Sequence, residues 1–183
     1  METTKNTLSP YASVFFTRLS NYLETPMYFF GSIQRNDYFP KYSDIDVDIF
    51  TDNENSTIIK MQHFFKIEKY KFKKFVYRID KHNKMVDGYK VSYKEKNNHL
   101  NAEFSIYNEK YKEMILEEHR RKFVLPYYVS FFLVFIKYFY YDLGIMPKIL
   151  YLKIKNFLMD NCVDGKHAEF VVIDLKEKEE EES

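Results

Sequence analysis

The chain has 183 residues and a mass of 22.4 kDa, which suits one domain and leaves no room for two of ordinary size. Hydrophobic residues make up 45% of it, which excludes a wholly disordered chain. The net charge is +1, but the last eight residues hold five Glu against two Lys, so this tail carries −3 and the rest of the chain +4. A single cysteine, Cys162, excludes an internal disulfide framework and fits a reducing compartment.

Hydrophobic periodicity and turn-forming residues predict an alternation of helices and strands over the first 108 residues. Ser9 and Pro10 are typical of a helix start, and Gly31 ends a short apolar run. The expected elements are a helix over 10–24, strands over 27–30 and 44–50, a helix over 53–70, and strands over 72–79, 86–93 and 100–107. Because only polar turns separate the last three strands, we expect them to form an antiparallel meander.

The rest of the chain is expected to be helical. Helices are predicted over 109–121, 127–142 and 147–160, followed by a short strand at 171–173. A parallel βαβ series would not give this order, so the predicted class is α+β, with a mixed, largely antiparallel sheet flanked by helices and a helical C-terminal part. The expected organisation is a core over 1–108, a helical part packed on it over 109–175, and an acidic disordered tail over 176–183.

The most apolar stretch, residues 123–141, is the one candidate for a membrane span. A spanning helix needs about 20 consecutive apolar residues, and here Pro126 and Lys137 interrupt the run. The first nine residues are polar and do not resemble a signal peptide. The sequence therefore favours a buried helix in a soluble, cytoplasmic protein without membrane contact.

The strongest chemical signal is Gly31-Ser32, followed after eleven residues by a strand in which Asp44, Asp46 and Asp48 alternate with apolar residues. Carboxylates two apart on a strand point the same way and lie roughly 6–7 Å apart. They can share a divalent cation, and Mg²⁺ is typically held by one or two carboxylates plus substrate phosphates. Gly31 would allow a phosphate close to the backbone, and Ser32 would offer hydroxyl and amide donors.

A simpler explanation is a solvated edge face whose charges resist aggregation. It accounts for the alternation, but it does not account for the Gly-Ser turn that precedes it. Three carboxylates on one face also repel one another, a cost that a bound cation would remove. The metal-site interpretation is therefore favoured.

Gly31-Ser32 together with Ser43-Asp44-Ile45-Asp46-Val47 resembles the signature of the DNA polymerase β-like nucleotidyltransferase superfamily. The resemblance implies the nucleotidyltransferase fold, with Gly31 and Ser32 at the triphosphate and with Asp44 and Asp46 binding two Mg²⁺ ions. It also implies a third acid on a later antiparallel strand, for which Glu103 is the best match, although the family more often has Asp there. Mn²⁺ is an alternative to Mg²⁺.

Some residue assignments stay open. Asp80 and Asp87 are weaker candidates for the third acid because both lie at turns, and a metal pair of Asp46 with Asp48 is an alternative register. Lys137 is the only charged residue of its apolar helix. By resemblance it would bind phosphate, while the simpler interpretation has it extending to solvent.

The predicted function is transfer of NMP from an NTP to an acceptor hydroxyl, with release of pyrophosphate. By resemblance, one ion would activate the hydroxyl for in-line attack and the other would stabilise the leaving group. The rival hypothesis is a catalytically silent relative that acts as a binding or partner subunit, such as a nucleotide sensor or an antitoxin-like protein.

The acceptor and the oligomeric state are left open. An RNA end, a small molecule and a protein side chain are all compatible with the sequence. Residues 60–96 hold twelve Lys or Arg against four acids, a weak indication of an anionic acceptor.

Overall fold

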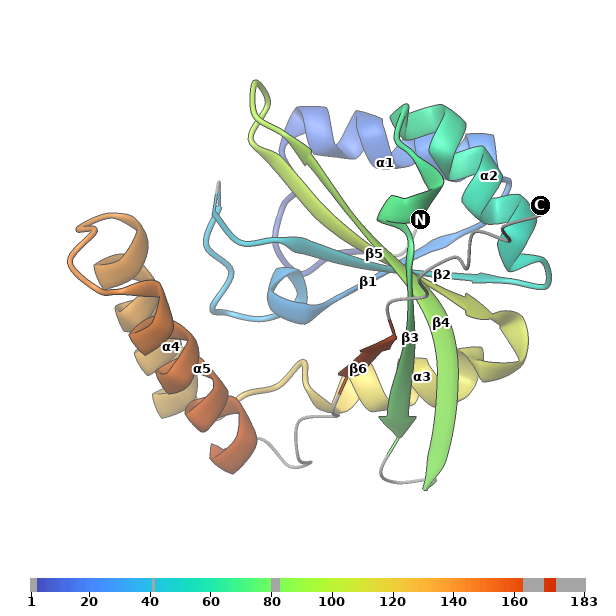
Figure 1. The fold of residues 1–183 in the computed structure, drawn as a ribbon. Helices are drawn as coiled ribbons and strands as arrows, with labels where there is room; N and C mark the ends of the chain where they lie inside the picture. The colour runs from blue at the N-terminus through green and yellow to red at the C-terminus, as the bar shows by residue number, and fades with distance from the viewer. Residues whose placement is uncertain (1–2, 41, 80–82, 163–169, 174–183) are drawn as a thin grey trace, which may run out of the picture.

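The computed structural model describes residues 3–40, 42–79, 83–162 and 170–173. They form a six-stranded mixed sheet in the order β1-β2-β5-β4-β3-β6, with helices on both faces (Figure 1). The strands are β1 (Met27–Phe30), β2 (Ile45–Thr51), β3 (Lys73–Ile79), β4 (Lys84–Glu95), β5 (Leu100–Asn108) and β6 (Phe170–Ile173). This confirms the predicted α+β class.

Strand pairing confirms the meander and adds one parallel contact. β3, β4 and β5 pair antiparallel in sequence order, and β6 joins the outer edge of β3. One interior pair, β2 and β5, is parallel, and β1 lies antiparallel on the other side of β2. The acidic strand β2 is therefore interior, which rules out the edge-strand explanation for its carboxylates.

Five α-helices accompany the sheet in the described part of the chain: α1 (Pro10–Leu23), α2 (Glu54–Phe65), α3 (Lys112–Arg121), α4 (Tyr127–Tyr141) and α5 (Lys148–Cys162). The Ser9 hydroxyl caps α1 by accepting from the Ala12 amide at 3.1 Å. The prediction for 53–70 was too long, because Lys66 takes a left-handed conformation (φ 55°) and ends α2. A short 3₁₀ turn, η2 (Lys69–Lys71), follows.

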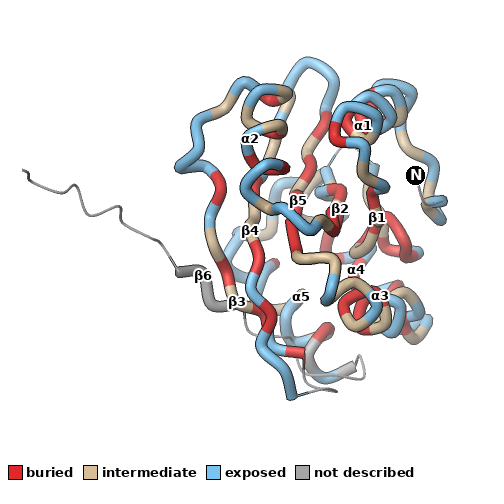
Figure 2. The backbone as a smooth tube through the Cα atoms, turned by 90° about the vertical axis from the view of Figure 1, so that its right-hand side faces the viewer, coloured by how far each residue is buried: buried red, intermediate tan, exposed pale blue. Residues whose placement is uncertain are grey.

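Alternation along the strands divides the sheet into two buried faces. Val47, Phe104 and Ile106 pack with α1 and α2 in the larger core. The opposite face packs Phe75, Tyr77 and the neighbouring Tyr107 against α3 in a smaller core. In Figure 2 the buried backbone is concentrated along the central strands and the inward sides of the helices. Asp46, Asp48 and Glu103 belong to the α3 face by this alternation.

Helices α4 and α5 form a hairpin that stands beside the sheet (Figure 1). The two pack on each other through Val129, Leu133, Tyr151 and their neighbours. The prediction of a buried helix over 127–142 holds for one side only, because seven residues of α4 are exposed. In the part of the chain that the structure describes, no helix is both long enough and apolar enough to cross a membrane.

Candidate active site

A cavity of about 360 Å³ opens between the sheet and the helical hairpin. All six residues that the sequence singled out as site residues line it, together with six that it did not. The lining comprises Gly31, Ser32, Arg35, Ser43, Asp44, Asp46, Glu103, Lys137, Tyr141, Tyr151, Lys155 and Met159. Segments more than a hundred residues apart in the chain thus meet in one place.

Strand register brings the acidic residues together. Asp46 of β2 pairs directly with Glu103 of β5, so their side chains project side by side from one face. Asp44 lies just before β2 and borders the same cavity. The three carboxylates therefore come from two neighbouring strands and one loop end.

Gly31 follows β1 in a left-handed conformation, with φ of +69°. A Cβ placed there would overlap Oδ2 of Asp46 and lie 3.0 Å from its Cγ. Only glycine fits both the backbone angle and this close approach. The turn therefore lies directly against the carboxylate that the sequence placed at the metal site.

The N-terminal segment fixes this turn from outside. The Asn6 amide donates to the carbonyls of Ile33 and Arg35 at 2.9 and 2.7 Å. Gln34 donates to the carbonyl of Phe29 at 3.1 Å and accepts from the backbone N–H of Lys5 at 2.9 Å. These bonds hold the short 3₁₀ turn η1 (Gly31–Gln34) against β1, so that its start faces the cavity.

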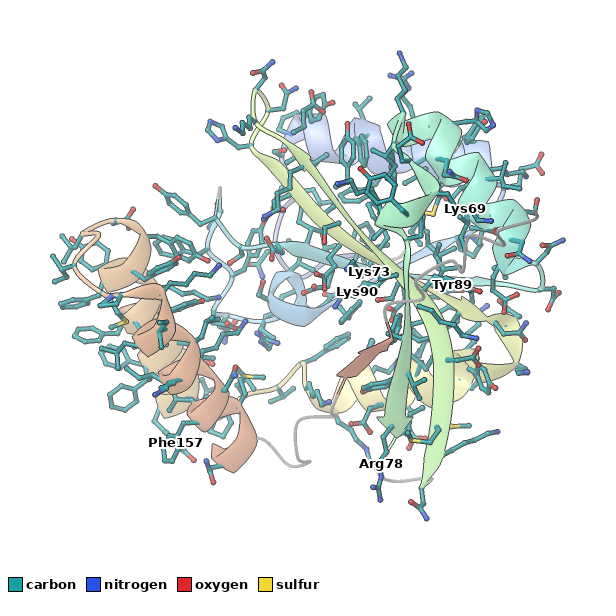
Figure 3. All side chains as sticks on the ribbon, in the orientation of Figure 1. Lys69, Lys73, Arg78, Tyr89, Lys90 and Phe157 are labelled. Carbon is teal, nitrogen blue, oxygen red and sulfur yellow. The ribbon has the colours of Figure 1, made fainter. Side chains whose placement is uncertain are left out.

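The two aspartates of the site have raised pKa values. Burial, together with the negative charges of Glu103 and Asp44, raises the pKa of Asp46 to about 7. Burial also raises the pKa of Asp44. Lys90 forms an ion pair with Glu103, and the Asn101 amide donates to Asp44. Lys90 is labelled in Figure 3, near the middle of the sheet.

The donor set fits a hard divalent cation, since it consists of carboxylate oxygens that repel one another without one. Among the described residues, however, no group of three acidic, His or Cys side chains is arranged to hold a metal ion. Glu103 is directed to Lys90, and Asp44 to Asn101. Rotation of these two side chains toward Asp46 would be needed to complete a site.

Behind the cavity lies a buried ion-pair network that the sequence did not reveal. Arg35 donates to both carboxylate oxygens of Asp37, at 2.7 and 3.1 Å. Lys137 reaches the same residue, 3.0 Å from Oδ2 and 2.5 Å from the backbone oxygen. Burial alone would raise the pKa of Asp37, but its two cationic partners outweigh that effect and hold it at about 2.

Lys137 lies at the cavity, as the phosphate-binding interpretation requires, and its ammonium bonds to Asp37. Its side chain is only 5% exposed, so it does not extend to solvent. Burial lowers the pKa of its ammonium, against the opposing charge of Asp37. It lines the cavity, but its hydrogen bonds go to the loop beside it, including one to Ser43 at 3.5 Å.

Lys155 is a third cationic residue at the cavity, after Arg35 and Lys137, and the sequence analysis missed it. It lies on α5, and its charge lowers the pKa of both Asp44 and Asp46 against the effect of burial. Tyr141 and Tyr151 line the cavity from the same hairpin, their rings 5.9 Å apart. The spacing of four residues puts Tyr151 and Lys155 on the same side of α5, but it does not tell whether that side faces the cavity.

The alternative acids are not part of the cavity. Asp48 is fully buried beneath α3, where His119 Nδ1 lies 2.9 Å from its Oδ2, and it does not line the cavity with Asp46. Asp87 is exposed at an ion-pair distance of 3.4 Å from Lys74. Asp80 lies outside the described residues.

The comparisons agree with this geometry. The sequence model of the nucleotidyltransferase domain family matches residues 15–123, which include both the glycine turn and all three carboxylates. The match covers more than half of the chain, so the protein belongs to the nucleotidyltransferase domain family. No curated protein and no solved structure matches it.

Proposed function

We propose that the protein is a metal-dependent nucleotidyltransferase that transfers NMP from an NTP to an acceptor hydroxyl and releases pyrophosphate. The observation that carries the proposal is the meeting of Asp44, Asp46 and Glu103 beside the Gly31 turn, in a chain of this family. Two Mg²⁺ ions, or Mn²⁺, held by these carboxylates would supply Lewis-acid activation of the hydroxyl and neutralise the leaving group.

The other residues of the cavity would bind and orient the nucleotide. The backbone at Gly31 and the donors of Ser32 would receive the triphosphate, because the turn lies directly against the Asp46 carboxylate and so next to the proposed metal site. Lys155 would supply the positive charge for it. The sequence prediction gave the phosphate-binding role to Lys137. We propose Lys155 instead, because the Lys137 ammonium already bonds to Asp37.

Asp46 would also move a proton. Its pKa of about 7 leaves it partly protonated at neutral pH in the protein alone. Positive charge arriving at the carboxylate cluster would favour the ionised form and release that proton. The Asp46 carboxylate would then be able to bind the metal ion next to the Gly31 turn.

The silent partner subunit stays as a second candidate because of one observation. Glu103 pairs with Lys90 and does not point to the other two acids. A protein that only binds a nucleotide does not need the third acid at the metal site, so this arrangement is compatible with it. The two candidates differ in turnover: a silent relative binds NTP without consuming it, while an enzyme releases pyrophosphate. The acceptor is still open among an RNA end, a small molecule and a protein side chain.

Calorimetric titration of NTP with and without Mg²⁺, followed by pyrophosphate release, separates these cases. The enzyme proposal predicts metal-dependent binding and pyrophosphate release, both lost in Asp44→Asn. Asp87→Asn is the matched control, since it removes an exposed carboxylate that does not line the cavity. Tight NTP binding that needs neither metal nor Asp44 would contradict the proposal.

A further inference from the structure

The helix α4 presents an unusual surface to solvent. All of its exposed residues are aromatic or aliphatic: Tyr127, Tyr128, Phe131, Phe132, Val134, Phe135 and Tyr138. Spaced at 3.6 residues per turn, they occupy one continuous side of the helix, which we call the apolar face of α4. Amphipathic helices normally place polar residues on the solvent side, so this helix is apolar on both sides.

The apolar face is too large to be an ordinary feature of a monomer. Its exposed fractions include 89% for Tyr127, 66% for Phe131 and 58% for Tyr128. Taking about 200 Å² for a whole aromatic side chain, the six aromatic residues expose roughly 700 Å². The largest apolar patch of a typical monomer is about 300–600 Å².

The hairpin extends this surface beyond α4. Ile149 and Phe157 of α5 are 72% and 63% exposed, and Phe157 lies on the side of the hairpin away from the sheet (Figure 3). The cavity side of the same two helices carries Lys137, Tyr141 and Lys155. The apolar face and the cavity are thus on different sides of the hairpin, and covering one leaves the other open.

We propose that the apolar face of α4 is the interface of a homodimer, in which two hairpins pack into a four-helix bundle. A twofold axis brings two identical patches together, and an uncharged patch is complementary to itself. Two copies would bury about 1,400 Å² in total, within the range of stable, specific interfaces. Packing of two antiparallel helix pairs is also the ordinary geometry of such bundles.

The charges on and around the apolar face of α4 argue against three alternatives to a second copy: a charged partner protein, the chain's own acidic tail and a membrane surface. All seven residues of the face are uncharged, so nothing on it would select an acidic or basic partner. The chain's own acidic tail, with five Glu in the last eight residues, is a poor match for it. A helix that lies on a membrane surface carries Lys or Arg on its opposite, polar side, whereas the opposite side of α4 packs against α5 and Lys137 is the only cation of the helix.

The test is the mass of the full-length protein in solution, by sedimentation velocity over a wide concentration range. The proposal predicts a species of twice the chain mass of 22.4 kDa that dissociates on dilution. Phe131→Glu combined with Phe135→Glu would bury four carboxylates in the dimer and should weaken it by at least about a hundredfold. Tyr70→Glu is the matched control, because Tyr70 is at least as exposed as Phe131 and Phe135, at 70%, but lies in η2.

Circular dichroism first establishes that each variant is folded. If a variant does not fold, the mass of the wild-type protein alone still tests whether it forms a dimer. A wild type that stays monomeric at every concentration would overturn the proposal. So would a dimer that persists unchanged in the folded double variant. Flotation with neutral or anionic lipid vesicles, by a protein that is monomeric without them, would show that a membrane covers the face instead and would also overturn it.

Discussion

Substitution of Gly31 by alanine tests the contact on which the candidate site depends. The backbone at φ +69° costs a non-glycine residue roughly 1–2 kcal/mol. The added methyl would also overlap Oδ2 of Asp46, and crowding of this kind costs roughly 1–3 kcal/mol. We therefore expect Gly31→Ala to lower the free energy of unfolding by roughly 2–5 kcal/mol.

A double-mutant cycle separates the two contributions. Asp46→Ala removes Oδ2 and Cγ and leaves only Cβ, 3.3 Å from the new methyl. In that background Gly31→Ala should cost only the backbone contribution, so the two substitutions should couple by roughly 1–3 kcal/mol. Gly144 is the matched control: its φ is +64° but no atom lies within 4 Å of an added Cβ. Gly144→Ala should cost roughly 1–2 kcal/mol without coupling to Asp46→Ala.

The assay is urea unfolding, followed by circular dichroism, of the wild type, the two single variants and the double variant, with Gly144→Ala alone and combined with Asp46→Ala measured alongside. Additivity of Gly31→Ala and Asp46→Ala within about 0.5 kcal/mol would refute the close approach of the turn to the carboxylate. Equal costs for Gly31→Ala and Gly144→Ala would refute it as well.

Three further predictions concern the charged groups of the cavity. Lys137→Met leaves part of the charge of buried Asp37 unpaired and should cost roughly 3 kcal/mol in urea unfolding, whereas a cost under about 1 kcal/mol would contradict the network. Lys155→Met should barely change stability but weaken NTP binding by about tenfold or more in calorimetry; unchanged affinity would remove Lys155 from the triphosphate site. Without added metal, the raised pKa of Asp46, about 7, means that the native state binds an extra proton between pH 4 and 7. The free energy of unfolding should therefore fall as pH rises through that range, and the slope should flatten in Asp46→Asn; an identical slope in the variant would contradict the assignment.

Much of the fold was predictable because its signals are local. The alternation of apolar and acidic residues over 44–50 predicted β2 and the face that its carboxylates share. Ser9-Pro10 predicted the start of α1 at the residue where it begins. The end of α2 was missed because the left-handed residue that terminates it is Lys66, a residue type that does not signal such a conformation.

The candidate site was predictable only in part. The turn and the two aspartates are close in sequence, and alternation put Glu103 on a face opposite to Ala102 and Phe104. That Glu103 lies beside Asp46 depends on the parallel pairing of β2 with β5, which no local pattern specifies. The positions of Lys155 and of the Asp37 network depend on where the hairpin packs, a property of the tertiary structure.

The exposed side of α4 was missed for a related reason. An apolar helix is expected to be buried all round, and hydrophobicity alone does not tell whether the chain itself supplies the cover. Within the described structure, packing against α5 buries residues such as Val129 and Leu133 on one side only. The other side stays exposed in the described structure, and this exposure is the observation behind the homodimer proposal.

The central claim is that the carboxylate cluster performs nucleotidyl transfer, and a labelling assay tests it most directly. Each α-labelled NTP would be supplied with Mg²⁺, then with Mn²⁺, and with total RNA, the protein itself and a pool of small hydroxyl compounds as acceptors. The account predicts label on one of these pools with wild-type protein and none with Asp46→Asn. Label that moves equally well with Asp46→Asn, or no label on any pool despite intact metal-dependent NTP binding, would contradict it.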